Sequence, residues 1–251
     1  MTDSTVFFAG TTPALNWTKQ TMKAGGIVPA ESPDWNIRHL ILDVPSFRNG
    51  DPLCGNRKLD TLLEALPHNI IIWGGNLNHP RLSGYHTIDL LRDEDYLLEN
   101  AAITADCTID LLSPKLDGAW NKQNVLIIGW GRIGKCLARK LQALGCSITV
   151  SARSQNDIEQ LQSLGISAIP TSLVRLYTDA FSLIINTVPA PVLSSEDTAL
   201  LSCLKIDLAS IKGLDGNNVI WARGLPGRFA PERSGKLIAE TILRLWKEES
   251  K

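Results

Sequence analysis

The sequence lacks a long apolar run, although 44% of its 251 residues are hydrophobic. No stretch approaches the roughly 20 apolar residues that a membrane-spanning helix needs. The N-terminus also lacks the basic region and the longer apolar stretch of a secretion signal. The net charge of −1 at pH 7 offers no excess of positive charge to nucleic acid or to a membrane surface. We therefore expect a cytoplasmic globular protein that binds neither nucleic acid nor membranes.

Metal-binding residue types are scarce as well. The chain has five cysteines and four histidines, and no two cysteines form a C-x-x-C pair. No histidine accompanies a cysteine at a spacing typical of metal sites. We expect no metal site, and we interpret the cysteines as small buried hydrophobic residues in a reducing compartment.

Residues 124–154 form the most informative segment that is present. The apolar run Val125–Ile128 indicates a buried strand of a parallel sheet, and a G-x-G-x-x-G pattern with an amphipathic helix follows it. Gly129 permits a tight turn, Gly131 lets the backbone approach a pyrophosphate, and Gly134 lets the helix pack closely on the strand. A glycine turn without a ligand is the alternative, but the flanking strand and helix favour a dinucleotide site.

The start of that helix supplies the phosphate contacts. Backbone N–H groups at the positive end of the helix, at Arg132 and Ile133, are expected to hold the phosphates. The end of the next strand then indicates which dinucleotide binds. NAD enzymes usually place an acid there, about twenty residues into the motif, whereas this chain has Ser151, Arg153 and Ser154. A guanidinium binds a 2′-phosphate as a bidentate fork, so we predict NADP, with NAD as the alternative.

The order of the elements predicts an α/β fold with two layers. We expect a smaller, flavodoxin-like α/β domain at residues 1–114, on the substrate or dimer side, and a Rossmann-type doubly wound parallel sheet at 115–251. A long helix over Asp93–Leu112 joins the two, and the last helix, which begins at Pro231, is able to cross back to the first domain. The strands of the first half are expected at Thr5–Ala9, His39–Val44, Asn69–Trp73 and Thr87–Leu90.

Three strand-end loops follow the glycine motif. Ligands of open α/β sheets bind beyond the carboxyl ends of the strands, which places residues 186–189, 207–210 and 225–227 around the nicotinamide end of the cofactor. The alternative for the N-T-V-P segment at 186–189, taken alone, is a polar turn, but three such strand-end loops after one glycine motif favour a site. The cofactor contacts expected from these loops are Thr187, Val188, Pro189, Leu225 and Pro226.

Four segments of the C-terminal half resemble the dipicolinate synthase A subunit family of spore-forming bacteria. They are GWGRIG with SARS, INTVPAPVL at 185–193, DLASIKG at 207–213 and RGLPGRFAPERSGKLIAETIL at 223–243, and TADCTIDLL at 104–112 is similar to the family's connecting helix. The resemblance covers about residues 100–245. This chain departs from the family at Ile211 and Lys212, where an arginine usually follows Ser210, and at Arg223 and Arg228, which replace uncharged residues.

The resemblance implies an NAD(P)-dependent oxidoreductase that makes pyridine-2,6-dicarboxylate (dipicolinic acid) in sporulation. A dihydrodipicolinate-type ring would give one hydride to the nicotinamide and release one proton. Asn186 and Ser210 would position the ring or the nicotinamide amide. Arg228 is the predicted ligand of a substrate carboxylate. The other basic residues on these loops are Arg233, Lys212 and Arg223, and a surface cation is the alternative for each of the four. Asp207 completes the predicted catalytic set, with a buried loop cap as its alternative role. The resemblance also implies that the partner is a flavoprotein-like B subunit, and we expect a homo-oligomer.

Two other functions remain open. A 2-hydroxyacid dehydrogenase acting on a small keto acid would have a similar fold, but it needs an acid–base group, most often a histidine. The chain has no histidine after His86, whereas that family carries its histidine after the cofactor motif. The other alternative is a dinucleotide-binding subunit without catalysis, which the altered Ile211–Lys212 loop would fit.

Overall fold

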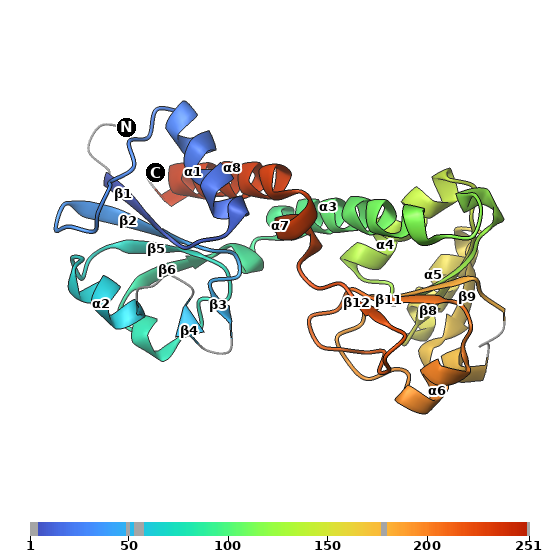
Figure 1. Cartoon of the computed structure of the whole chain (residues 1–251). Coiled ribbons are helices and arrows are strands. Elements are labelled where there is room, and N and C mark those ends of the chain that lie inside the picture. The colour runs from blue at the N-terminus through green and yellow to red at the C-terminus, as the bar shows by residue number, and fades with distance from the viewer. Residues whose placement is uncertain (1–4, 49–50, 53–57, 177–179, 250–251) are drawn as a thin grey trace. The chain divides into compact units, whose positions relative to one another are not determined.

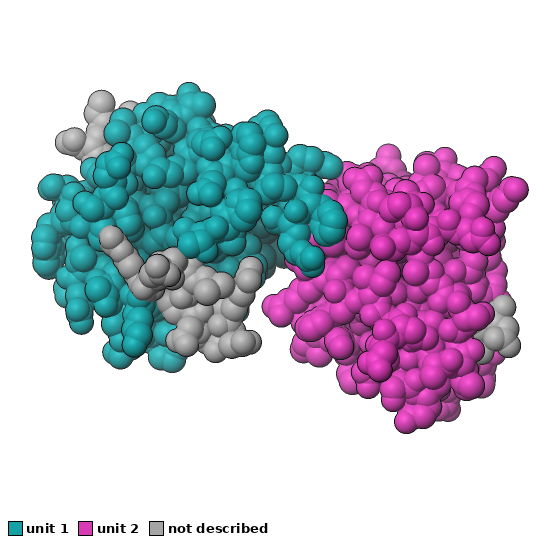
Figure 2. All heavy atoms as spheres, viewed as in Figure 1, with its two compact units in different colours: residues 1–100, 226–251 teal, residues 101–225 magenta. Residues whose placement is uncertain are grey.

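The computed structural model describes residues 5–48, 51–52, 58–176 and 180–249 (Figure 1). The chain divides into two compact units, coloured teal and magenta in Figure 2. Unit 1 comprises residues 1–100 and 226–251, and unit 2 comprises residues 101–225. The domains predicted from sequence were 1–114 and 115–251, whereas the division between the compact units falls inside the long helix α3 (Glu94–Leu112).

Unit 1 is built on a four-stranded parallel sheet with the order β1-β2-β5-β6. Its strands alternate with helices along the chain, as the apolar runs and their glycine and proline boundaries predicted. A two-stranded antiparallel pair, β3 and β4, lies within the segment 45–55, which showed no strand pattern. The elements are β1 (Thr5–Ala9), α1 (Pro13–Ala24), β2 (Ile37–Leu42), β3 (Phe47–Arg48), β4 (Asp51–Pro52), α2 (Leu59–Glu64), β5 (Ile71–Gly74), the 3-10 helices η1 (Pro80–Leu82) and η2 (Leu90–Arg92), β6 (His86–Asp89), and α8 (Pro231–Glu249).

The unit 1 sheet is covered on both faces, because alternate strand residues point to opposite sides. Phe7 packs in one apolar cluster with α2, and its neighbour Val6 packs in another with α1 and α8. Helix α8 lies against α1 although more than 200 residues separate them, and the Thr18 hydroxyl donates to the Gly235 carbonyl at 3.1 Å. A Cβ at Gly235 would overlap the α1 backbone, so glycine permits the close approach. The C-terminal helix is therefore part of unit 1.

Unit 2 is built on a six-stranded parallel sheet with the order β12-β11-β10-β7-β8-β9. This is the doubly wound order of a Rossmann fold, with the reversal between β7 and β10, and ligands of such sheets bind at that point. The α/β fold class is confirmed. The elements are η3 (Ser113–Lys115), η4 (Trp120–Lys122), β7 (Asn124–Ile128), α4 (Arg132–Ala143), β8 (Ser147–Ala152), α5 (Gln155–Ser163), β9 (Ser167–Pro170), η5 (Thr171–Leu176), β10 (Leu183–Asn186), α6 (Ser195–Leu200), β11 (Leu204–Asp207) and β12 (Ile220–Trp221). The short helix α7 (Leu225–Phe229) begins at the last residue of unit 2 and continues in unit 1.

Two helices differ from the expectation. Residues 225–227 were expected in a strand-end loop, but they begin the short helix α7. Helix α6 was missed although its signal is in the sequence: Ser194 and Asp197 form a capping box, in which each side chain accepts the backbone N–H of the other residue. Among the residues that the structure describes, no helix is long and apolar enough to cross a membrane.

Candidate functional site

The glycine turn between β7 and α4 lies at the reversal point of the unit 2 sheet. Gly129 has φ 104°, a left-handed conformation that other residues rarely adopt. A Cβ there would also lie 2.6 Å from Thr187 Oγ1 and 2.8 Å from Val188 Cγ2. A Cβ at Gly134 would overlap the Gly129 carbonyl. Both glycines are therefore needed by the fold itself.

Gly131 has no such structural reason to be a glycine. It is the N-cap of α4 with φ −81°, and a Cβ there would meet no atom within 4 Å. Gly131 supplies no side-chain cap to this helix, and no acidic residue lies in the first turn. A helix start without a cap from Gly131, beside open space at its positive end, fits the phosphates of a dinucleotide.

The end of β8 carries Arg153 without a competing acid. Arg153 is exposed, and its guanidinium forms no ion pair with any residue that the structure describes. Asp157 is turned toward its own helix, since its carboxylate accepts the Ser154 hydroxyl at 2.7 Å and Ser154 Oγ caps α5. Ser151 is fully buried, at 3.3 Å from the Thr171 hydroxyl. Of the three predicted residues, Arg153 alone offers an exposed side chain with no partner in the described structure.

A buried network joins the strand-end loops after β10 and β11. Asp207 is fully buried, and its carboxylate accepts four donors: Asn186 Nδ2 at 3.0 Å and the N–H groups of Ala209, Gly213 and Leu214 at 2.7–2.9 Å. The Asn186 amide also exchanges hydrogen bonds with the Val188 backbone. These contacts match the alternative role of Asp207 as a loop cap, and the network fixes the loop that carries Ser210.

The remaining predicted residues lie in different settings. Thr187 donates its hydroxyl to the Ile128 carbonyl at 2.9 Å, so the 186–189 loop is fastened directly to the glycine strand. Pro189 and Ser210 are exposed, and Leu225 is buried at the end of unit 2. Pro226 and Arg228 belong to unit 1. The structure thus brings the 186–189 loop to the glycine turn, and the roles of Ser210, Leu225, Pro226 and Arg228 stay predictions.

Sequence reasoning overlooked two features. Lys205 on β11 is buried, and its ammonium donates to the carbonyls of Leu201 and Cys203, which ties down the end of α6. Lys212 lies over the ring of Trp221 at 5.2 Å, and Trp221 donates to the Ala209 carbonyl at 3.1 Å. The Lys205 contacts are local, but no sequence pattern signals that a lysine side chain turns back onto nearby carbonyls, and the Trp221 contacts join two separate strand ends. Among the described residues, no group of three metal-ligating side chains comes together.

These features are typical of a dinucleotide-binding α/β fold, and a known family matches part of the chain. The family model described as "D-isomer specific 2-hydroxyacid dehydrogenase, NAD binding domain" matches residues 113–192. The matched segment contains β7, the glycine turn, β8 and residues 186–192 at the end of β10 and beyond it. Residues 113–192 are therefore similar to the NAD-binding domain of a dehydrogenase family.

The chain is also similar to the dipicolinate synthase A subunit of Bacillus subtilis (strain 168). The two sequences are 28% identical over 171 residues, which is 64% of this chain and 58% of the relative. The chain thus matches less than two thirds of the length of this curated relative. The resemblance that the motifs predicted is confirmed: this protein is like the dipicolinate synthase A subunit and has a 2-hydroxyacid dehydrogenase NAD-binding domain.

Two solved structures extend the similarity in fold to almost the whole chain. The dipicolinate synthase A subunit from Bacillus halodurans has a TM-score of 0.82 at 21% identity, with 97% of this chain and 98% of that chain covered. Its counterpart in the dipicolinate synthase from Bacillus subtilis has a TM-score of 0.80 at 22% identity, with 99% and 97% covered. At these identities the comparison shows the fold alone.

Proposed function

We propose that the protein is an NADP-dependent oxidoreductase that converts a dihydrodipicolinate-type ring to pyridine-2,6-dicarboxylate in spore formation. The observation that carries the cofactor part is the open start of α4, where Gly131 leaves space and supplies no side-chain cap. The similarity to the dipicolinate synthase A subunit supports the substrate. A cytoplasmic homo-oligomer working with a flavoprotein-like B subunit completes the proposal.

The cofactor is held by the glycine turn and by the end of β8. The N–H groups of Arg132 and Ile133 bind the pyrophosphate, and Arg153 binds the 2′-phosphate as a bidentate fork. Bound NADP supplies a hydride acceptor. Thr187, Val188 and Pro189 line the nicotinamide end, because their loop packs on the glycine turn.

The substrate is held by residues with separate tasks. Arg228 binds one ring carboxylate, and the exposed Ser210 hydroxyl orients the ring through a hydrogen bond. Asn186 and Asp207 act as positioning residues, since both are fully buried and hold the 186–189 and 208–214 loops together. Aromatisation of the ring supplies driving force, so the oxidation needs no strong general base.

The test of the cofactor assignment is a fluorescence titration of NADPH and NADH against the wild type and Arg153→Ala. We expect the wild type to bind NADPH more tightly than NADH, and the variant to lose at least tenfold in NADPH affinity while NADH affinity stays unchanged, since one charged hydrogen-bonded contact contributes about 1.5–3 kcal/mol. Arg139→Ala, on α4 away from its start, is the matched control. Equal affinity for both cofactors in the wild type would contradict NADP.

The matched family model favours one alternative, a 2-hydroxyacid dehydrogenase activity. Against it, all four histidines precede residue 87, so unit 2 contains no histidine for acid–base chemistry. Turnover assays with NADP and either a dihydrodipicolinate or a small 2-hydroxy acid separate the two activities. Tight NADPH binding without turnover of either substrate would instead indicate a non-catalytic dinucleotide-binding subunit.

A further inference from the structure

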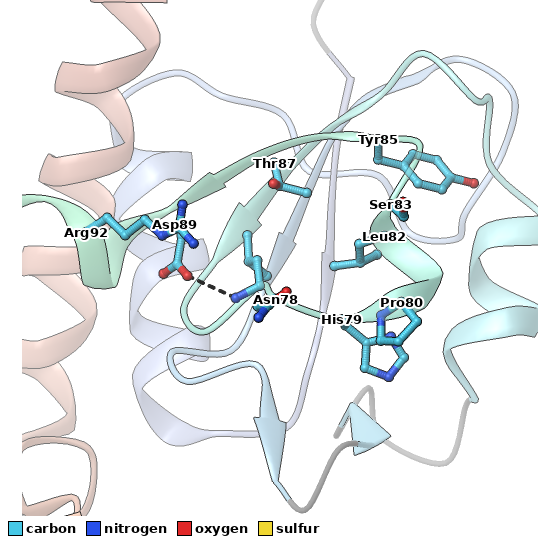
Figure 3. Close-up of a pocket in the computed structure, with 10 residues that line it drawn as sticks. Asn78, His79, Pro80, Leu82, Ser83, Tyr85, Thr87, Asp89 and Arg92 are labelled. Carbon is cyan, nitrogen blue, oxygen red and sulfur yellow. Dashed lines mark hydrogen bonds between the residues drawn. The ribbon is translucent and has the colours of Figure 1, made fainter.

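Unit 1 contains a pocket of its own, which the proposed function does not use. Its volume is about 510 Å³, within the roughly 300–1,000 Å³ typical of small-molecule sites. The lining residues come from the β5–β6 connection, from β6 and from η2, and all belong to one compact unit (Figure 3).

The edge strand explains how the pocket forms. Tyr85, Thr87 and Asp89 alternate along β6 and the residue before it, so their side chains share one face. The chain that precedes β6 turns through η1 and returns alongside this face. The pocket therefore lies between an edge strand and the loop that leads into it, with buried Leu77 and Leu82 beneath.

The two ends of the pocket differ in chemistry. Figure 3 shows Arg92 extending from η2 toward Asp89, with Asn78 and Thr87 nearby, whereas the rings of His79, Pro80 and Tyr85 lie at the other end. His79 is held in place by stacking on Phe47, with ring centroids 4.7 Å apart. One end thus offers hydrogen-bond donors, and the other offers flat surfaces.

The groups at the polar end that have no partner in the described structure favour an anion over a cation. Arg92 forms no ion pair with any residue that the structure describes. Asp89, the acid in the lining, is already engaged: its oxygens accept the N–H groups of Asn76, Leu77 and Leu91 at 2.9–3.0 Å. A bound amine would find no free carboxylate, whereas a bound carboxylate would find a free guanidinium.

We propose that this pocket binds a small ring carboxylate, with the carboxylate on Arg92 and the ring against Pro80 and Tyr85. Asn78 and Thr87 supply further hydrogen bonds, since no partner in the described structure uses their side chains. Bidentate pairing with a guanidinium selects a planar carboxylate, and the flat walls at the other end select a ring. The site lies wholly in unit 1, so it binds whether or not cofactor is present.

The test is calorimetric titration of the full chain with three probes in metal-free buffer: pyridine-2,6-dicarboxylate, benzoate and inorganic phosphate. We expect both ring carboxylates to bind saturably, and phosphate, which lacks a ring, to bind at least tenfold more weakly. Arg92→Ala should weaken the carboxylates about tenfold or more, and Thr87→Val, which keeps the shape, about threefold. Arg81→Ala is the control, because Arg81 is outside the lining and pairs with Asp60.

Arg92 is exposed and unpaired in the described structure, so its replacement should leave the unfolding midpoint and NADPH binding unchanged. Equal binding of the carboxylates to the wild type and Arg92→Ala would overturn the proposal. A dicarboxylate signal that is lost in Arg228→Ala but kept in Arg92→Ala would overturn it too, while leaving the proposed function intact. If the wild type fails to bind NADPH but still binds the ring carboxylates, the proposed function is contradicted and this site is not.

Discussion

The two units contain the same kind of turn, from a first parallel strand into a helix, but they differ in whether side chains of the protein cap the start of that helix. In unit 1 the start of α1 is filled by the protein itself: the buried Asp43 accepts the N–H groups of Thr11 and Thr12, and Thr12 caps the helix at Leu15 N. In unit 2 Gly131 supplies no side-chain cap at the start of α4 and faces open space. The same element pair is closed in one unit and open in the other.

The difference shows why fold alone does not locate a cofactor. Both sheets are parallel, and both turns point N–H groups out from a helix start, which by itself suits an anion. In unit 1 a carboxylate of the chain already occupies that position, and a Cβ at Gly10 would overlap it. The open helix start therefore distinguishes the dinucleotide-binding unit from its neighbour.

The largest expected effect comes from removing the acid that closes unit 1. In Asp43→Ala the N–H groups of Thr11 and Thr12 and the Thr12 hydroxyl lose a buried acceptor. We expect the free energy of unfolding to fall by about 3 kcal/mol, since three partly buried hydrogen bonds are lost and each contributes about 1 kcal/mol. Urea unfolding followed by circular dichroism measures the change.

Asp60→Ala is the matched control in the same unit, because the Asp60–Arg81 ion pair is half exposed and should contribute less than about 1 kcal/mol. Asp43→Asn keeps the volume and one acceptor, so its loss should lie between the two. Wild-type stability in Asp43→Ala would remove the basis for calling the α1 turn closed.

We expect a smaller, pH-dependent effect on stability that differs between the units, because all four histidines belong to unit 1. His39 is buried between tryptophans: Trp73 donates to its Nδ1 at 3.1 Å, and the Trp246 ring centroid lies 3.8 Å away. Burial lowers the pKa of His39 from 6.5 to about 4. Between these values the unfolded chain binds a proton that the folded chain does not, so stability falls as the pH is lowered from about 6.5 toward about 4.

The measurement is the urea midpoint at pH about 7 and about 5, read from tryptophan fluorescence, in the wild type and His39→Gln. Glutamine keeps an acceptor for Trp73 but does not titrate, so the variant should lose much of the pH dependence. Unit 2 has no histidine, and its unfolding should depend less on pH in this window. An identical pH dependence in both proteins would show that His39 is not its source.

Whether the state of each helix start could be predicted from the sequence depends on how far apart the interacting residues lie along the chain. The turn of unit 2 was predicted because Gly129, Gly131 and Gly134 act within one strand–helix step. The closure of unit 1 was not predicted, since Asp43 lies 31 residues from Thr12 and nothing in the local pattern joins them.

The same reasoning applies to the predicted catalytic residues. Asn186 and Asp207 were correctly placed at neighbouring strand ends, because the order of a doubly wound sheet brings them together. That both side chains are fully buried and bind each other could not be inferred, since it depends on how the 208–214 loop folds back. Arg92 was overlooked because a lone arginine after a short strand resembles any surface cation.

The smallest expected change in stability comes from placing a carboxylate at the start of α4, as Asp43 does at the start of α1. This variant is also the most direct test of the comparison. Gly131→Asp places a carboxylate at the α4 N-cap, where the backbone already has the extended conformation of a capping residue and a Cβ meets no atom. We expect the free energy of unfolding to rise by about 0.5 kcal/mol. NADPH affinity should fall more than tenfold, because the new carboxylate takes the N–H groups and repels the phosphates. Gly131→Ala, the control, crowds the site without a charge, so it should lose affinity and gain little stability. If Gly131→Asp binds NADPH as tightly as the wild type does, the open start of α4 is not where the dinucleotide binds.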